Sequence, residues 1–278
     1  MTIGIDIGST TTKAIVVDHE DIIIKAKTRA EDPLTAATGI IGKITQENNL
    51  HINDIKKIIV TGVGSSGIKN NIFDIETERI DEISAIGRGG VFLAGIDPIM
   101  IVNIGTGTVI VEYDHGESRH FGGSGVGGGT IIGLSKALLN ITGFSEIMDL
   151  ASKGDASRVD LQIQDIVSET ISFLGKDATA ANFGKMEEGA SREDIASALI
   201  NMVYQVIGML AVFAGRAEKM DKVILTGNGS NNMLGRKVLE AITAMYGIEF
   251  IYTQDAEYAT AIGAALSNYP HHVTYKVS

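Results

Sequence analysis

One pattern occurs twice along this chain: a short apolar strand ends in a turn of Gly and hydroxyl residues and returns as a second strand. The first copy is DIGSTTTK, residues 6–13, and the second is NIGTGT, residues 103–108. Short β-type runs joined by tight turns predict antiparallel strands. Because each copy opens a stretch of alternating strands and helices, the sequence predicts an α/β fold built from two similar halves.

The rest of the chain supplies the other elements of both halves. The apolar runs and their periods predict strands at 2–6, 14–17, 22–26, 57–61, 99–104, 223–226 and 248–252, and helices at 35–48, 82–94, 131–139, 192–220, 234–245 and 257–266. Ser191 and Asp194 predict a capping box at the start of the longest helix. A length of 278 residues suits two linked domains better than one core. We expect the halves to span residues 1–98 and 99–278.

Composition excludes several classes of function. The net charge is −11 with no cluster of Lys or Arg, which argues against nucleic-acid binding. The chain has no Cys, which excludes disulfides, thiolate metal sites and a Cys nucleophile. The N-terminal MTIGIDIGST lacks the pattern of a signal peptide, and the apolar stretch 202–214 is too short to span a bilayer. We therefore expect a cytoplasmic protein that does not bind membranes.

The first motif has the residues of a phosphate-binding turn. Gly8, Ser9, Thr10 and Thr11 can aim backbone N–H groups and hydroxyls at phosphate oxygens. Asp6 can hold Mg²⁺ through its carboxylate, because hard cations prefer oxygen ligands. Lys13 can offset charge that develops on a phosphoryl group. The alternative is a plain β-hairpin with a polar turn.

Three further Gly-rich turns follow strands or precede helices. The second motif offers Gly105, Thr106 and Gly107 as another phosphate loop, and Gly127, Gly128 and Gly129 precede a predicted helix, where anions bind readily. The alternative for residues 127–129 is a flexible loop. In TGNGSNN, residues 226–232, Gly227 and Asn228 can approach a nucleoside, although a purely structural turn is equally consistent.

Taken together, these motifs resemble the fold of actin, Hsp70 and the sugar kinases, and in detail the type II pantothenate kinases. The matching segments occur in the order of that family: DIGSTTTK, IDEI (80–83), NIGTGT, GGSGVGGGT (122–130), ASKGD (151–155), DATAANFG (177–184) and AIGAAL (261–266). They cover nearly the whole chain. The resemblance implies a two-domain actin-like ATPase fold of the ribonuclease H-like type, with duplicated mixed sheets flanked by helices.

The resemblance also implies a reaction and the residues that carry it. ATP would phosphorylate pantothenate to 4′-phosphopantothenate in coenzyme A biosynthesis, with Mg²⁺ at Asp6 and with Glu82 as general base. Without the resemblance, Glu82 beside Asp81 would be interpreted as a solvated acid at a helix start. Thr106, Val109, His120, Ala180 and Ala181 fall at substrate-binding positions of the family.

Family members are also homodimers, and a coenzyme A thioester is an expected feedback ligand. The apolar helix 192–220 is a candidate partner face, although burial within its own subunit is equally consistent with the sequence.

Two positions depart from the family pattern. Relatives usually carry Arg where His120 stands, and many carry Ser where Val109 stands. Arg119 is adjacent to His120, but neighbours on a strand alternate faces, so its side chain would point elsewhere. These departures bear on the identity of the substrate rather than on the phosphate loops.

Three other functions remain open at this stage. DIGSTTTK also resembles the start of the 2-hydroxyacyl-CoA dehydratase activators, but their iron–sulfur cluster needs Cys ligands, so only an ATPase switch without a cluster survives. A kinase-like protein that binds without turnover is disfavoured because Glu82 is retained. A related kinase that acts on a different hydroxyl substrate is the remaining alternative.

Overall fold

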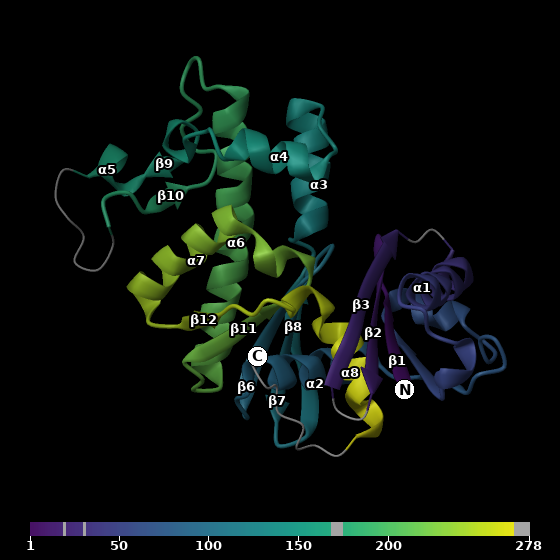
Figure 1. Cartoon of the computed structure of the whole chain (residues 1–278). Helices are drawn as coiled ribbons and strands as arrows, with labels where there is room; N and C mark the ends of the chain where they lie inside the picture. Colours follow the sequence, from purple (N-terminus) through teal and green to yellow (C-terminus); the bar gives the residue numbers. More distant parts are fainter. Residues whose placement is uncertain (19–20, 30–31, 168–174, 270–278) are drawn as a thin grey trace.

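The computed structural model of this chain describes residues 1–18, 21–29, 32–167 and 175–269. They form two five-stranded sheets, a two-stranded sheet and the helices around them (Figure 1). Each large sheet contains both parallel and antiparallel neighbours. The predicted α/β architecture with duplicated mixed sheets is therefore confirmed.

The first sheet has the strand order β3-β2-β1-β4-β5. Its strands are β1 (Thr2–Ile7), β2 (Thr11–Asp18), β3 (Asp21–Arg29), β4 (Lys57–Thr61) and β5 (Thr77–Arg79). The strands β1, β2 and β3 form an antiparallel meander, whereas β4 and β5 continue parallel to β1. Helix α1 (Pro33–Glu47) buries the apolar side predicted from its spacing, including Ile40, Ile41 and Ile44.

The second sheet repeats the same plan, in the order β12-β11-β6-β7-β8. Its strands are β6 (Ile99–Ile104), β7 (Thr108–Asp114), β8 (Glu117–Ser124), β11 (Lys222–Thr226) and β12 (Glu249–Ile251). The first three are antiparallel, and β11 and β12 run parallel to β6. The strand register is also the same in the two sheets. Asp6 pairs with Lys13 in the first sheet, and Asn103 pairs with Val109 at the equivalent position of the second.

Two helices from distant parts of the chain lie between the sheets (Figure 1). Helix α2 (Glu82–Ala94) packs on β6, β7 and β8, and α8 (Ala259–Ala265) packs on β1, β2 and β4. The two helices also cross each other closely, since a Cβ at Gly89 would lie 1.8 Å from the carbonyl oxygen of Ala259. One hydrophobic cluster accordingly joins residues of both sheets, Ile15 and Val111 among them, through α2 and α8.

Ion pairs also link the two halves. Lys25 on β3 contacts Asp255 at 2.7 Å, and Lys27 contacts Glu257 at 3.1 Å, just before α8. Both carboxylates follow β12 in the chain, so the edge of the first sheet is tied to the end of the second.

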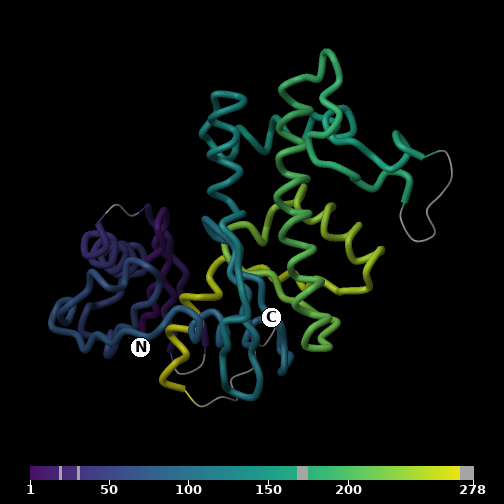
Figure 2. Tube along the Cα trace, turned by 180° about the vertical axis from the view of Figure 1, so that it is seen from behind, coloured from purple at the N-terminus to yellow at the C-terminus, as the bar shows by residue number. Residues whose placement is uncertain are grey.

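The second half carries a larger helical lobe than the first. It contains α3 (Gly128–Leu139), α4 (Phe144–Ala151), α6 (Arg192–Ala217) and α7 (Met233–Tyr246). The short elements α5 (Ile163–Ile166), β9 (Leu161–Gln162) and β10 (Thr179–Ala181) project beyond α6, far from the first sheet (Figures 1 and 2). The predicted capping box is present at the start of α6, where Ser191 and Asp194 exchange hydrogen bonds of 2.8 and 3.1 Å.

Helix α6 is longer than the apolar stretch 202–214 suggested. Among the described residues it is the one single helix long and apolar enough to cross a membrane, so our expectation that the stretch is too short was wrong. Of its most apolar window, 56% is buried inside the fold. Packing against α3, α4 and α7 therefore accounts for its apolar composition.

Candidate active site

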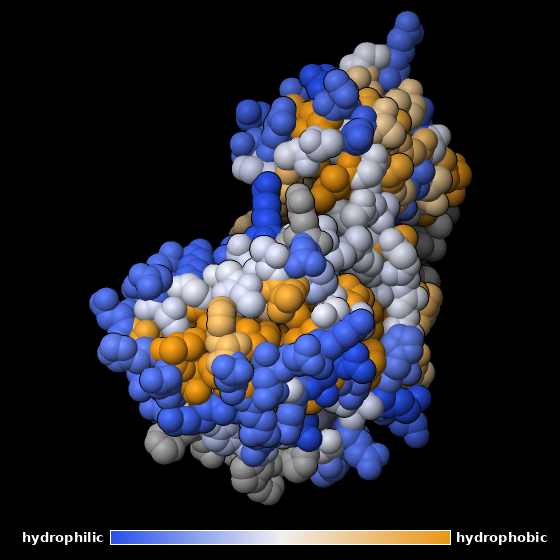
Figure 3. All heavy atoms as spheres, turned by 90° about the vertical axis from the view of Figure 1, so that its right-hand side faces the viewer, coloured by the Kyte–Doolittle hydropathy of each residue, from blue (hydrophilic) through white to orange (hydrophobic). Residues whose placement is uncertain are grey.

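A cleft of about 260 Å³ lies where the strand-end turns of both sheets meet. The surface is visibly hollowed between the lobe of the first sheet and the upper helical lobe (Figure 3). Thirteen of the residues selected from the sequence line the cleft: Asp6, Gly8, Ser9, Thr10, Thr11, Lys13, Glu82, Gly105, Thr106, Gly107, Val109, Gly227 and Asn228. Folding thus gathers four separate segments of the chain at one place.

The first turn holds an acid and an ammonium group side by side. Asp6 is the last residue but one of β1 and lies directly opposite Lys13 on β2, and Lys13 is only 5% exposed. Burial raises the pKa of Asp6 to about 6; Lys13 opposes that rise and Glu82 adds to it. Burial likewise lowers the pKa of Lys13, against the opposing effect of Asp6. The two groups are therefore poorly hydrated, and any charge that binds nearby will shift their pKa values further.

Glu82 reaches the cleft from the first residue of α2. Its neighbour Asp81 is the N-cap and accepts a hydrogen bond of 2.8 Å from the backbone N–H of Ser84. Asp81 is exposed, whereas Glu82 is half-buried and burial raises its pKa. The capping role thus belongs to Asp81, and the Glu82 carboxyl group is left to face the cleft.

Side chains of opposing turns touch across the cleft. The hydroxyls of Ser9 and Thr106 share a hydrogen bond of 2.9 Å, and the amide of Asn228 donates to the Thr11 hydroxyl at 3.2 Å. The first contact joins the two predicted phosphate loops, and the second joins the first loop to the fourth motif. Hydroxyl, amide and backbone groups therefore converge from both halves.

The fourth motif has a counterpart in the first half. The turn after β4 reads TGVGS and the turn after β11 reads TGNGS, with φ of +84° at Gly62 and +83° at Gly227. A Cβ at either glycine would lie within 2.7 Å of a backbone oxygen at the end of β1 or β6. Only Gly fits there, which explains why both turns keep it.

Gly127, Gly128 and Gly129 do not line the cleft. The N–H groups of Gly128 and Gly129 donate to the carbonyls of Gly105 and Thr106, each at 2.9 Å. A Cβ at Gly127 would lie 2.7 Å from the carbonyl of Gly107. These three glycines therefore brace the second phosphate loop from behind, because their absent side chains allow two backbone segments to touch.

His120 also lies outside the cleft wall. It is exposed on β8 opposite Val111, on the face of the sheet that includes Val109. Arg119 points to the other face, where it contacts Glu112 and donates to Glu218 at 2.6 Å. The expected divergence of Arg119 from His120 is confirmed.

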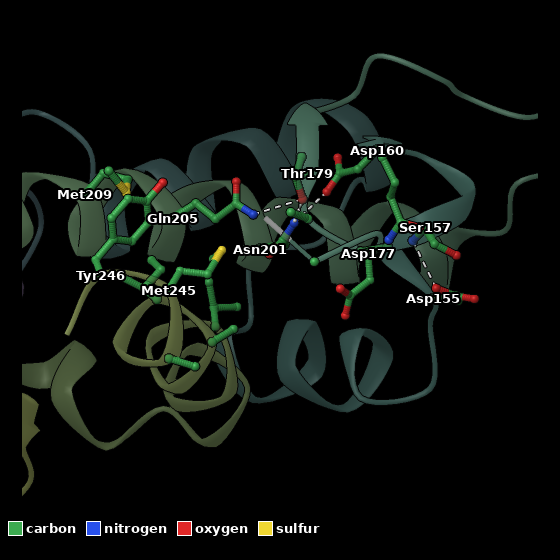
Figure 4. A pocket seen from close by; sticks show the side chains of 18 residues that line it. Asp155, Ser157, Asp160, Asp177, Thr179, Asn201, Gln205, Met209, Met245 and Tyr246 are labelled. Carbon is green, nitrogen blue, oxygen red and sulfur yellow. Dashed lines mark hydrogen bonds between the residues drawn. The ribbon is translucent and has the colours of Figure 1, made fainter. Parts of the chain in front are cut away.

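Ala180 and Ala181 lie on β10, beside a different cavity of about 610 Å³. Figure 4 shows acidic side chains toward one end of this cavity and Met209, Met245 and Tyr246 toward the other. The buried Asp160 accepts from Asn201 at 2.6 Å, and burial raises its pKa. Among the described residues, those that line this cavity are all different from those that line the cleft between the sheets.

Val63, Ser124 and Thr260 line the cleft but were not selected from the sequence. Val63 stands in the first TGxGS turn, and its match to TGNGSNN was the signal that could have found it. Thr260 enters from α8, whose position between the sheets no local pattern discloses.

The groups around Asp6 suit a cation that takes oxygen ligands. The Asp6 carboxylate is poorly hydrated, and Asn103 supplies an amide oxygen at the equivalent position of the second sheet. Hard oxygen donors of this kind match the preference of Mg²⁺.

Comparisons with known proteins agree with this architecture. The profile of the Fumble family matches residues 94–267. A type II pantothenate kinase of Staphylococcus aureus (strain bovine RF122 / ET3-1) is 30% identical over 95% of this chain and 98% of its own, and that of strain USA300 is 29% identical over the same shares.

Solved structures share the fold at lower identity. The activator of 2-hydroxyisocaproyl-CoA dehydratase from Clostridium difficile with bound ADPNP has a TM-score of 0.68 at 22% identity, over 95% of this chain and 92% of that one. The ROK hexokinase from Thermus thermophilus has a TM-score of 0.56 at 13% identity, over 95% of this chain and 97% of that one. The expected actin-like ATPase fold is therefore confirmed.

Proposed function

Because this chain belongs to the Fumble family of type II pantothenate kinases, we propose that it transfers the γ-phosphoryl group of ATP to the primary hydroxyl of pantothenate in coenzyme A biosynthesis. One observation carries the proposal: a half-buried carboxylate, an acid–ammonium pair and hydroxyl-rich turns of both halves share one cleft. Phosphoryl transfer depends on positioning and charge stabilisation more than on covalent chemistry, and these groups supply both.

ATP binds, in this proposal, across the cleft between the two sheets. The turns at residues 8–11 and 105–107 hold the phosphates, and Gly227 and Asn228 approach the nucleoside. Support comes from the related fold of the dehydratase activator, whose structure contains ADPNP. Gly127, Gly128 and Gly129 contribute by fixing the shape of the second loop.

Asp6 is the proposed ligand of Mg²⁺, directly or through water, with Asn103 beside it. The ion would neutralise phosphate charge. A poorly hydrated carboxylate gains more from a nearby cation than an exposed one does, because low polarity strengthens the attraction. Lys13 stands opposite Asp6 and can stabilise charge on the transferred group.

Glu82 is the proposed general base. It lines the same cleft as Val109 and stands at the start of α2, which packs on the second sheet. A carboxylate within hydrogen-bond reach of the substrate hydroxyl can take its proton as transfer proceeds. Burial, which raises the pKa of Glu82, makes it a better base than an exposed Glu.

A kinase assay across pantothenate, pantetheine and simple sugars tests the reaction. We expect ATP-dependent phosphorylation of pantothenate and none of hexoses. Phosphorylation of a sugar in its place, with pantothenate inert, would show that the family reaction has been replaced.

His120 and Val109 favour one alternative, a related kinase for a hydroxyl substrate that lacks the carboxylate. A guanidinium can clamp a carboxylate with two charge-assisted bonds, which imidazole cannot. Losing a charged hydrogen bond costs about 1.5–3 kcal/mol. Pantothenate should therefore bind weakly, and His120→Arg should lower its KM about tenfold. A wild-type enzyme with tight pantothenate binding, unimproved by this change, would show that the loss is compensated.

The subunit arrangement proposed is a homodimer in the cytoplasm. Ala180 and Ala181 are exposed on β10, which lies far from the first sheet (Figure 1), and neither residue lines the cleft of its own subunit. In a dimer, Ala180 and Ala181 of one subunit would approach the substrate bound in the cleft of the other subunit, as the family pattern suggests. Light scattering gives the mass in solution, and a monomeric active enzyme would remove these two residues from the site. A coenzyme A thioester remains the proposed feedback ligand.

A further inference from the structure

Val63 is an apolar side chain in a cleft whose other walls are mostly polar. It is 66% exposed and belongs to none of the three hydrophobic clusters of the described residues. Among the described residues that line the cleft, only Val63 and Val109 carry large apolar side chains. Val63 therefore adds nothing to the cores and is available to a bound molecule.

The turn holds Val63 rigidly in this position. A Cβ at Gly62 would lie 2.6 Å from Oδ1 of Asp6, and one at Gly64 would lie 2.5 Å from Cγ2 of Ile7. The next residue, Ser65, is buried. Because the backbone on both sides presses against the end of β1, Val63 cannot withdraw into the protein.

The matching turn of the second half carries a different side chain at the position of Val63. Val63 corresponds to Asn228 in the TGxGS motif, and both turns have the same φ at their first glycine within 1°. Asn228 reaches into the cleft and donates to the Thr11 hydroxyl at 3.2 Å. The fold thus presents an amide from one half and a hydrocarbon group from the other.

Strand pairing puts Val63 on the side of Glu82. Strands β4 and β5 are parallel neighbours, and the N–H of Ile80 donates to the carbonyl of Val60 at 3.1 Å. The chain after β4 leads to Val63 within three residues of Val60, and the chain after β5 enters α2 at Glu82. Ends of parallel neighbours share one edge of a sheet, so the two side chains flank the same part of the cleft.

We propose that Val63 determines substrate specificity by contacting the branched alkyl carbon next to the hydroxymethyl group whose hydroxyl Glu82 deprotonates. The inference rests on the proposed function and adds a substrate class to it: primary alcohols on a branched hydrocarbon carbon. Pantothenate fits, because the carbon beside its hydroxymethyl group carries two methyl groups. A sugar would instead place hydroxyls against Val63, where they lose water without gaining a partner. Val109 offers a second apolar contact on the same substrate.

Steady-state kinetics of Val63→Ala and of the isosteric Val63→Thr test this, with pantothenate and an analogue that lacks both methyl groups. One methylene in an apolar pocket changes kcat/KM by about 10–200-fold. We expect both variants to lose about tenfold in kcat/KM for pantothenate, and less than twofold for the analogue. The KM for ATP should stay within twofold in each case.

Ile23→Ala is the matched control, because Ile23 is an exposed apolar residue on β3 outside the cleft. It should leave all constants unchanged. Equal losses on both substrates, a raised KM for ATP alone, or unchanged kinetics of the Val63 variants would each overturn the inference. A wild-type protein without pantothenate kinase activity would instead overturn the proposed function, and the inference with it.

Discussion

At the residue scale, the cleft combines two carboxylates and one ammonium group in poorly hydrated surroundings. Burial favours the neutral forms of all three, so Asp6 and Glu82 hold protons more tightly and Lys13 less tightly than in water. Asp6 and Lys13 partly offset each other through their pairing across β1 and β2. A bound cation and a nucleotide would shift the protonation of these three groups further.

Glu82→Gln should lower kcat by about 10²–10⁴-fold and leave ATP binding nearly unchanged, since an amide cannot accept the substrate proton. Single-turnover kinetics and calorimetry measure the two effects. Asp81→Asn is the neighbouring control: Asn is also a good N-cap, so folding and turnover should persist. Near-normal turnover of Glu82→Gln would remove Glu82 from the role of base.

The raised pKa of Asp6 predicts a pH-dependent need for Mg²⁺. With its pKa at about 6, Asp6 is mainly protonated below pH 6 and charged above it, so protons and the cation compete in acid. The Mg²⁺ concentration for half-maximal rate should therefore rise up to about tenfold per pH unit below pH 6. Asp6→Asn should abolish this dependence and require more Mg²⁺ at every pH. A half-maximal concentration that is constant from pH 5 to 8 would contradict the assignment.

Local motifs identified most cleft residues because their chemistry is local. A Gly and hydroxyl turn at a strand end already has groups that can hold a phosphate, so residues 8–11 and 105–107 could be selected as cleft candidates without a structure. Thr260 could not, because its place depends on where α8 packs. Gly127 to Gly129 do not line the cleft, and the sequence could not predict this, because a Gly-rich segment does not reveal whether a ligand or another backbone fills the space.

At the element scale, the crossing of α2 and α8 unites the two sheets. A Cβ at Gly263 would lie 1.8 Å from the carbonyl of Ala85, which mirrors the contact of Gly89 with Ala259. Each helix therefore presents a glycine to the backbone of the other. Both helices were expected from periodicity, with α2 at its observed bounds, but their contact was not, since spacing within one helix does not identify its neighbour.

Gly89→Ala should destabilise the fold, because the added methyl group forces α2 and α8 apart. Overpacking of this kind costs about 1–3 kcal/mol. Gly42→Ala is the control: its Cβ would meet nothing within 4 Å on α1, and Ala gains about 0.5–1 kcal/mol over Gly inside a helix. Urea unfolding of both variants measures the difference, and similar midpoints for the two would show that the helices can separate freely.

At the scale of the whole molecule, the two sheets carry one plan but different chemistry. The strands of the first lie within residues 1–98 and those of the second within 99–278, in line with the predicted halves. The charged pair of the first half, Asp6 and Lys13, is replaced by Asn103 and Val109 in the second. The division into two domains stays a prediction, because α2 and α8 each pack on the sheet of the other half.

Mg-ATP should stabilise the whole molecule, since the cleft draws on both halves. A ligand at 100 times its Kd adds about 2.7 kcal/mol to the free energy of unfolding. Thermal unfolding with Mg-ATP should therefore shift upward by several degrees, and Asp6→Asn should reduce the shift. An unchanged Tm at saturating Mg-ATP would contradict binding between the halves.

The position of α8 also sets the order of events during protein synthesis. The first sheet emerges from the ribosome well before α8, yet Gly4 on β1 packs against the backbone of Ala261 and Ala265 on that helix. At roughly 5–20 residues per second, the nascent sheet waits on the order of tens of seconds for the helix that covers it. Until then its apolar face is open to chaperones and to other nascent chains. Production of this protein in cells should thus depend on chaperone supply more than its final stability suggests.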